Sequence, residues 1–240
     1  MSFTAEQIRF SAQAWTMRAD EEYQSAAVFS AALDAVIAAA LPRSIASGLA
    51  KIVGDELKHA DLCAKLAEQL EAPSPTWRTD AVRARVANLP EPRGRAISLL
   101  LVEGAIGETI SSALFATGHN GTTEPAQRAT LRTILSDEVF HARFCWQALA
   151  RLDLGGDLEA MQAETARALG GLEHSRILPV LRRLEADVPF DPAWEVLGVL
   201  RPERRVEAFY GAIERSVIPR LNRLGIDGEN AWRHRYRKPT

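Results

Sequence analysis

The sequence has few of the features that mark a secreted, membrane or nucleic-acid-binding protein. Only two cysteines occur in 240 residues, which excludes a fold that depends on a disulfide framework. Neither sign of charge is in excess, because 29 Lys and Arg oppose 31 Asp and Glu for a formal net charge of −2. This balance predicts neither a nucleic-acid partner nor a membrane-surface partner. The hydrophobic content of 47% is enough for one large core.

Long hydrophobic runs and targeting signals are also scarce. The apolar run at 26–41 is interrupted by Ser30 and Asp34, so it predicts a buried helix rather than a membrane span. The first residues, 1–6, lack the basic start and apolar core of a signal peptide. We therefore expect a cytoplasmic protein with no membrane partner.

What the sequence does contain is a repeated nine-residue pattern. The stretches 55–63 and 137–145 both read D-E-x-x-H-A-x-x-C, and both lie within helical patterns. At about 100° per residue, a Glu and a His three positions apart share one face of a helix. A carboxylate and a neutral imidazole in this arrangement can bind one ion of iron, manganese or zinc. The two pairs are Glu56 with His59 and Glu138 with His141.

A second repeated pattern precedes each copy of the first. The stretches 22–29 and 108–115 share E-x-x-S-x-A-x-F. A doubled Glu-x-x-His suggests two metal ions and calls for two further carboxylates on the preceding helices, as in dinuclear carboxylate bundles. Glu22 and Glu108 occupy the required places, 34 and 30 residues ahead of the two glutamates of the nine-residue pattern. A whole pair of helices is therefore duplicated.

Together the two patterns resemble those of the ferritin-like di-iron carboxylate superfamily. Its signature, E…(D)ExxH, occurs in both halves of about residues 5–153. The resemblance implies an all-α protein with a ferritin-like four-helix bundle and one long crossover, a dinuclear iron centre, and dioxygen as co-substrate. The metal-binding and catalytic residues that it implies are Glu22, Glu56, His59, Glu108, Glu138 and His141.

The charges of this set are consistent with a buried centre. Four carboxylates balance two divalent cations, and this balance makes burial tolerable where isolated charges would be very costly. The ligand types favour two iron ions, with manganese as the alternative, ahead of zinc. We expect Glu56 and Glu138 to bridge the two ions and Glu22 and Glu108 to be terminal ligands.

An aspartate precedes the glutamate in both copies of the nine-residue pattern. A metal-bound histidine usually donates its other N–H to a carboxylate, which fixes the orientation of the ring. We expect Asp55 and Asp137 to have this role, each across the bundle to the histidine of the other repeat. The alternative is that both aspartates face solvent.

Glu103 leaves the third helix ambiguous. It lies five residues before Glu108, about 140° away on an ideal α-helix, so the two cannot both face one metal pair. A π-bulge would bring them closer, and Gly104 and Gly107 favour such a distortion. Alignment with Glu22 favours Glu108 as the ligand. Glu103 is then expected to support the site as an extra ligand or proton carrier, or else to be a surface charge.

The chain is expected to form one domain with two parts. Residues 1–155 would be the bundle, and residues 156–240 a C-terminal helical extension that packs over it, caps the site or forms a homodimer contact. Pro73, Pro75, Pro90 and Pro92 mark residues 72–92 as the crossover, with a short helix at 80–88. The other expected helices are about 4–42, 44–70, 93–117 and 124–152 in the bundle, and 157–185 and 202–224 in the extension.

Three functions are open at this point. The first is a di-iron oxidase or oxygenase that oxidises a small organic molecule with electrons from an external donor. The second is an iron-handling protein, either a ferroxidase or a peroxide scavenger, although the crossover and the C-terminal extension fit a ferritin cage less well. The third is a helical binding module without metal, against which the intact set of six ligands argues.

Overall fold

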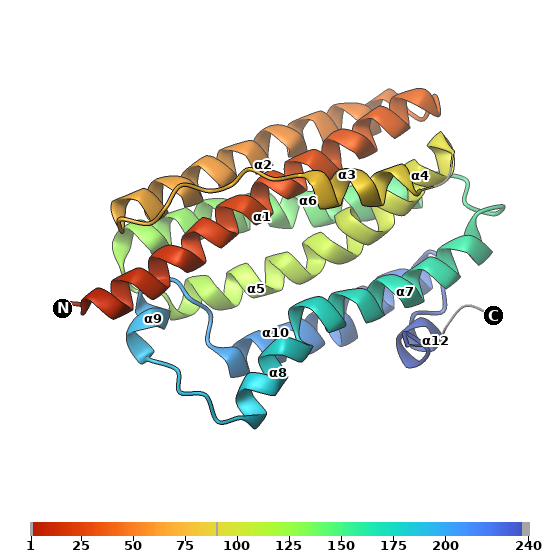
Figure 1. Cartoon of the computed structure of the whole chain (residues 1–240). Coiled ribbons are helices and arrows are strands. Elements are labelled where there is room, and N and C mark those ends of the chain that lie inside the picture. Colours follow the sequence, from red (N-terminus) through yellow and green to blue (C-terminus); the bar gives the residue numbers. More distant parts are fainter. Residues whose placement is uncertain (1, 90, 237–240) are drawn as a thin grey trace.

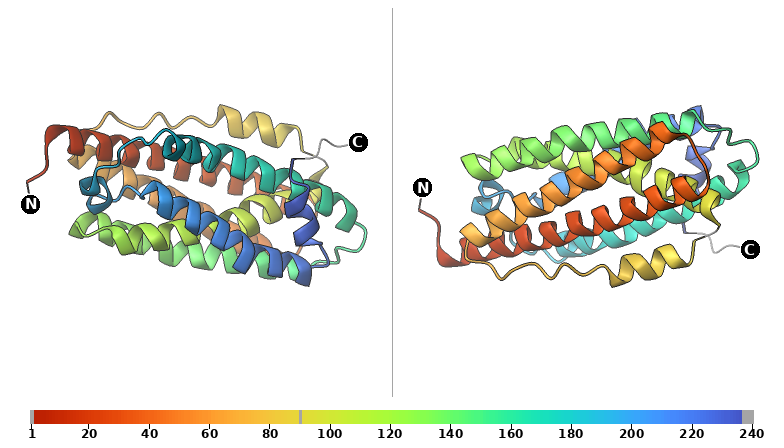
Figure 2. Two further views of the ribbon diagram at one scale, coloured as in Figure 1. Left: turned by 90° about the horizontal axis from the view of Figure 1, so that it is seen from below. Right: turned by 90° about the horizontal axis from the view of Figure 1, so that it is seen from above.

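The protein is all-helical, as the sequence predicts. The computed structural model describes residues 2–89 and 91–236, and this part of the chain contains no strand. Four long helical segments lie side by side, and further helices form a layer against one of their faces (Figures 1 and 2). The four long segments are α1 (Ala5–Ala38), α2 (Arg43–Gln69), the continuous helix Pro92–Gly121, and α6 (Pro125–Ala150).

The first two helices form a hairpin whose ends follow from local sequence. Thr4 and Gln7 make the predicted capping box, in which each side chain accepts a hydrogen bond from the other residue's backbone N–H. α1 ends at Ala38, Ala40 has a positive φ of 51°, and Pro42 directly precedes α2. The two helices then pack against each other along their length.

The third long helix changes its winding in the middle. It consists of α4 (Pro92–Leu99), the π-helix η1 (Leu100–Gly107) and α5 (Glu108–Gly121). The predicted distortion at the two glycines is therefore present. The turn predicted at 118–121 is wrong: the helix continues to Gly121, because Thr122 closes its last turn by donating from both its N–H and its hydroxyl to the Gly118 carbonyl.

This third helix is also the most apolar one. By length and composition alone, its 30 residues could cross a membrane, but half of its most apolar window is buried inside the molecule. Its apolar side chains face the other helices of the bundle, where Leu100, Leu101 and Ile106 are fully buried. A core helix of a folded domain accounts for this composition.

The crossover from α2 to α4 runs along the outside of α1. Residues 72–79 have no regular secondary structure, and α3 (Asp80–Ala87) follows them, close to the predicted short helix at 80–88. Asp20 of α1 holds the crossover by accepting hydrogen bonds from the backbone N–H groups of Thr76 (2.9 Å) and Trp77 (2.8 Å). Tyr23 contacts the Trp77 ring edge-on at 5.1 Å.

The C-terminal layer covers the α5 side of the bundle (Figure 1). The helix predicted at 157–185 is broken at Ile177, because Pro179 cannot continue an α-helix without losing a hydrogen bond and contacting an earlier carbonyl. Pro219 likewise follows the π-helix η2 (Ile213–Val217). The layer comprises α7 (Leu158–Arg176), α8 (Leu178–Glu185), α9 (Pro192–Val196), α10 (Pro202–Ala212), η2, α11 (Ile218–Arg223) and α12 (Gly228–Arg233).

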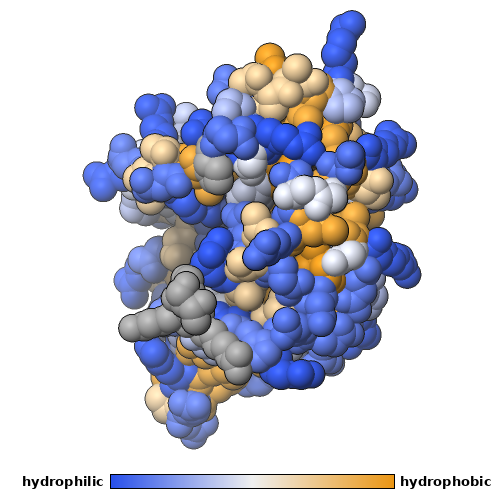
Figure 3. All heavy atoms as spheres, turned by 90° about the vertical axis from the view of Figure 1, so that its right-hand side faces the viewer, coloured by the Kyte–Doolittle hydropathy of each residue, from blue (hydrophilic) through white to orange (hydrophobic). Residues whose placement is uncertain are grey.

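The layer and the bundle share one hydrophobic core. Buried residues of both parts, such as Phe29 of α1 and Phe209 of α10, belong to the same apolar cluster. Trp15 of α1 donates a hydrogen bond of 3.0 Å from its indole N–H to the Leu197 carbonyl in the layer. At the end of the molecule shown in Figure 3, hydrophilic side chains cover most of the surface, with a strip of apolar side chains between them.

Candidate metal centre

Six ionisable side chains, four carboxylates and two imidazoles, meet inside the bundle from four helical segments. None of them is more than 6% exposed. Burial of this many ionisable groups in one place is very costly unless they are paired or bind a cation. The six are Glu22 of α1, Glu56 and His59 of α2, Glu108 of α5, and Glu138 and His141 of α6.

The six side chains form two overlapping groups. Within each group, one nitrogen or oxygen atom per residue lies within 4.8 Å of those of the others, which is close enough for all of them to hold one metal ion. Glu56 and Glu138 belong to both groups, as expected for carboxylates shared by two ions. One group is Glu22, Glu56, His59 and Glu138, and the other is Glu56, Glu108, Glu138 and His141.

The two imidazoles face the carboxylates through the same ring nitrogen. Nδ1 of His141 lies 3.1 Å from Oε1 of Glu56 and 3.7 Å from Oε2 of Glu108. Nδ1 of His59 lies 3.6 Å from Oε2 of Glu22. The centroids of the two rings are 5.9 Å apart. Each half of the cluster therefore has its own imidazole and its own terminal carboxylate.

Several polar atoms at the centre of the cluster lie near one another but are not hydrogen-bonded. Among the described residues, Nδ1 of His59, Nδ1 of His141, both carboxylate oxygens of Glu56 and Oε2 of Glu108 make no hydrogen bond. Unpaired buried polar atoms are rare in folded proteins because each one costs about 1–3 kcal/mol. These atoms point toward one another, and carboxylate oxygen with imidazole nitrogen is a suitable ligand set for iron or manganese. The buried cluster can thus hold metal ions.

The outward nitrogens of both rings contact the two aspartates of the repeated pattern. Nε2 of His59 lies 3.2 Å from Oδ2 of Asp137, and Nε2 of His141 lies 3.1 Å from Oδ2 of Asp55. Each contact crosses between α2 and α6, so the expected cross-bundle pairing is present. Each aspartate also pairs with a lysine of α2. These contacts fix the two rings with Nδ1 pointing inward.

Burial and neighbouring charges shift the pKa values of the carboxyl groups in opposite directions. Burial raises the pKa of Glu22 to about 8, and burial together with the nearby Glu108 raises that of Glu138 well above its ordinary value. For Glu56, burial also acts to raise the pKa, but the two histidines outweigh it and lower the pKa to about 2. Glu56 therefore stays ionised without a cation.

The two histidines supply the opposite charge in the metal-free protein. Burial acts to lower the pKa of each imidazole, but contact with Glu22 and Glu56 raises that of His59 to about 10. Contact with Glu108 and Glu56 raises that of His141 to about 10 in the same way. Protons on the imidazoles thus occupy the role that metal ions would take, and they must leave before Nδ1 can bind a metal.

Glu103 lies apart from this cluster. Its carboxylate pairs with Arg85 of the crossover helix α3, and neither metal-holding group in the described part of the chain includes it. Glu103 is therefore not the extra ligand or proton carrier that we expected. It has the alternative role of a charge near the helix surface. Glu108, which follows directly after the π-helix, enters the cluster instead. The sequence alone does not show that the crossover brings Arg85 next to Glu103.

Close contacts between helices depend on glycine at two positions. A Cβ atom at Gly104 of the π-helix would lie 2.4 Å from Sγ of Cys145 on α6. A Cβ atom at Gly48 of α2 would lie within 2.0 Å of the Phe144 ring. Cys145 and Cys63 are both buried free thiols, and burial raises their pKa values well above the ordinary range. The cysteines of the repeat are thus packing groups beneath the histidines.

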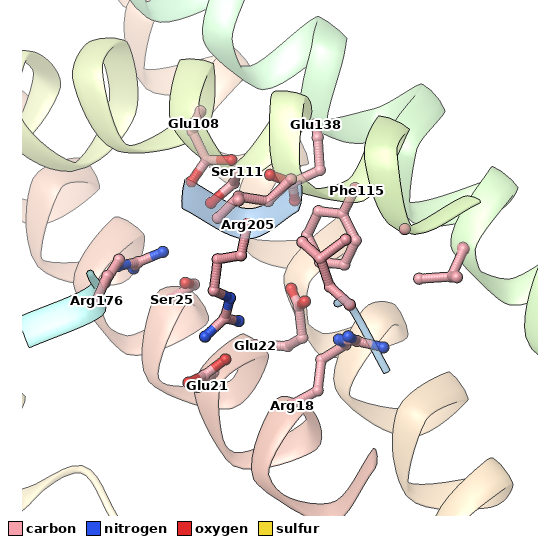
Figure 4. Close-up of a pocket in the computed structure, with 14 residues that line it drawn as sticks. Arg18, Glu21, Glu22, Ser25, Glu108, Ser111, Phe115, Glu138, Arg176 and Arg205 are labelled. Carbon is pink, nitrogen blue, oxygen red and sulfur yellow. The ribbon is translucent and has the colours of Figure 1, made fainter. Parts of the chain in front are cut away.

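A cavity of about 80 Å³ adjoins the cluster (Figure 4). Three of the six carboxylate and imidazole residues line it, namely Glu22, Glu108 and Glu138. Arg176 and Arg205 reach it from the C-terminal layer. Sequence reasoning missed both arginines, since they lie outside the repeat and carry no spacing signal of their own.

Comparison of the sequence with models of known protein families and with curated proteins gives no match. The function is therefore inferred from the buried cluster and from the cavity beside it.

Proposed function

We propose that this protein is a ferritin-like non-haem di-iron enzyme, an oxidase or oxygenase that uses dioxygen to oxidise a small organic molecule. The observation that carries the proposal is the convergence of six buried side chains, several of whose innermost nitrogen and oxygen atoms make no hydrogen bond. Manganese is the alternative metal, because it accepts the same ligands.

The arrangement of the helices supports the ferritin-like part of the proposal. Each of two helical hairpins contributes one glutamate from its first helix and a Glu-x-x-His pair from its second, which is the ligand plan of dinuclear carboxylate bundles. The long crossover 70–91 joins the hairpins along the length of the bundle.

The proposed ligands divide between the two ions according to the two groups. Glu22 and His59 would hold one ion, Glu108 and His141 the other, with Glu56 and Glu138 shared. When bound, the iron pair would supply the redox chemistry: insertion of one oxygen atom into a substrate consumes one O₂, two electrons from an external donor and two protons, and releases one water.

The chain's own residues would hold and shield the centre. Asp55 and Asp137 keep the two imidazoles in place through Nε2, so that Nδ1 remains directed at the ions. The buried ring of Phe29 lies 6.4 Å from the His141 ring, between centroids, and belongs to the apolar shell that keeps water from the centre.

The cavity favours an enzyme over an iron store. It lies directly beside Glu22, Glu108 and Glu138, and the C-terminal layer lines its other side. A site for a small organic molecule next to the reactive centre is what an oxidase or oxygenase requires. An iron-handling protein would instead take up many iron ions per chain.

Two glutamates on the same helix provide a matched test of the centre. We expect wild-type protein and the Glu103→Ala variant to bind two Fe(II) per chain in anaerobic titrations, and Glu108→Ala to bind fewer with weaker affinity. Mössbauer spectra after exposure to oxygen should then show a coupled iron pair in the first two proteins. Loss of metal in Glu103→Ala with two ions retained in Glu108→Ala would contradict the proposed ligand set. Uptake of many iron ions per chain would favour iron handling.

A further inference from the structure

The cavity beside the metal centre has an unusual concentration of arginines. Arg18 of α1 and Arg205 of α10 are half-buried, and Arg176 at the end of α7 lies at the exposed rim. In Figure 4 the three guanidinium groups lie below the carboxylates of Glu108 and Glu138, with Arg205 between the other two. The positive groups thus face the proposed metal ligands across the cavity.

These three arginines have no ion-pair partner within 4.0 Å in the described part of the chain. Arg18 is held by its contact with the Trp15 ring, 4.4 Å from the centroid, and by a long hydrogen bond of 3.4 Å to the Gly198 carbonyl. Neither Arg176 nor Arg205 donates a hydrogen bond to another described residue. The arginines that do form ion pairs are Arg85, Arg93, Arg201, Arg204 and Arg235.

The charge around the cavity is positive once the centre is loaded. Two divalent cations would offset the four carboxylates of the cluster, which leaves three arginines against the single carboxylate of Glu21. An excess of two positive charges beside a partly enclosed cavity is unfavourable without a counter-ion. A bound anion would offset this positive charge, and the two N–H groups of a guanidinium match the oxygens of a carboxylate or phosphate.

A second cavity adjoins the first on its outer side. It measures about 310 Å³ and shares four lining residues with the inner cavity, including Arg18 and Arg205. Its other walls are largely apolar, with Phe10, Met17 and Phe190 among them. A molecule that passes from the outer cavity toward the metal centre therefore meets apolar side chains first and the two arginines next.

We propose that the substrate is a small organic anion with an apolar body, whose carboxylate or phosphate is bound by Arg205 with Arg18 and Arg176. The part to be oxidised would then lie in the inner cavity beside Glu22, Glu108 and Glu138. This inference rests on the proposed function for the site of reaction. The C-terminal layer would then select the substrate, because it supplies Arg176 and Arg205.

Paired probes of equal shape and different charge test the proposal. Benzoate with neutral benzamide, and acetate with acetamide as a smaller pair, are titrated calorimetrically into anaerobic Fe(II)-loaded protein. Phenyl phosphate, which differs from benzamide in shape, is added as a phosphate probe and compared with benzamide. We expect at least one oxyanion to bind about tenfold or more tightly than its amide. Arg205→Gln should remove this preference and Arg205→Lys should weaken it. Arg167→Gln, which removes an exposed arginine of α7 outside the cavity, should leave it unchanged.

The outcomes separate this inference from the proposed function. Iron content and helicity are measured on the same samples, so a variant that has lost its fold or its metal is recognised directly. Two irons per chain with no preference for any oxyanion over its amide would overturn the anion site and leave the metal centre standing. Wild-type anion affinity in Arg205→Gln would do the same, because the anion would then be bound without the arginine at the centre of the proposed site. Absence of iron would overturn the proposed function.

Discussion

Loading of the centre with two divalent cations is expected to release about four protons per chain at pH 7, because metal ligands must lose their protons to bind. Two of the protons come from the imidazoles of His59 and His141, whose pKa values are raised to about 10. The other two come from Glu22, with a pKa of about 8, and from Glu138, whose pKa is raised well above its ordinary value. Glu56, with a pKa of about 2, is already ionised and contributes none.

The direction of the pH dependence follows from this count. Protons compete with the cations for the same atoms, so binding tightens as the pH rises. Near pH 7, the overall constant for binding both cations should increase by about four orders of magnitude per pH unit, one for each proton released. The dependence should weaken as the pH passes first about 8, where Glu22 has lost its proton, and then about 10, where the histidines have lost theirs.

Anaerobic calorimetry in buffers of different ionisation enthalpy measures the number of protons released on metal binding. The apparent binding enthalpy changes linearly with the ionisation enthalpy of the buffer, and the slope is the number of protons released. The Glu103→Gln variant should give the wild-type slope, because Glu103 pairs with Arg85 outside the cluster. A release of two protons or fewer at full occupancy would refute the reasoning, because Glu22 and Glu138 alone account for two and the histidines would then have no protons to lose.

Two further predictions concern the packing and the orientation of the centre. Gly104→Ala should lower the free energy of unfolding of the metal-free protein, measured in urea, by about 1–3 kcal/mol, because the new Cβ would collide with Cys145. Gly54→Ala should instead raise it by about 0.5–1 kcal/mol, because no atom lies within 4 Å of the new Cβ. Equal effects at the two sites would contradict the close approach of the helices. Asp55→Asn should weaken Fe(II) binding about 10–100-fold through its contact with His141, and unchanged affinity would show that Asp55 does not orient the ring.

The six proposed ligands could be found from the sequence because the pattern is duplicated and fits the ligand plan of dinuclear carboxylate bundles, which also calls for Glu22 and Glu108. Helical periodicity puts Glu56 and His59 on one face, and duplication of the pattern supports the same assignment at Glu138 and His141. A distortion of the third helix was also anticipated, because Glu103 and Glu108 cannot both face one metal pair on a regular α-helix and Gly104 and Gly107 favour a π-bulge. Local geometry and repetition were sufficient for these features.

Features that depend on contacts between distant segments could not be predicted in this way. Glu103 pairs with Arg85 because the crossover passes beside the third helix, and no local pattern encodes this passage. Arg176 and Arg205 line the cavity because the C-terminal layer folds back over α5, and neither arginine stands at a repeated or periodic position. The helix end at Gly121 was missed because Thr122 caps a turn whose composition is typical of a loop.

The contacts of the C-terminal layer make the two sides of the centre different, since only one side faces the cavity described above. The duplicated ligands form a nearly symmetric pair, yet of the two shared carboxylates Glu138 lines the cavity, whereas Glu56 is not among its described lining residues. Ser25 and Ser111, which are equivalent in the repeat, both line this same cavity. Because this cavity lies between the C-terminal layer and the cluster, a substrate would reach the centre at Glu22, Glu108 and Glu138. Under the proposed function, the repeat would account for metal binding, and the unrepeated layer would account for the choice of what is oxidised.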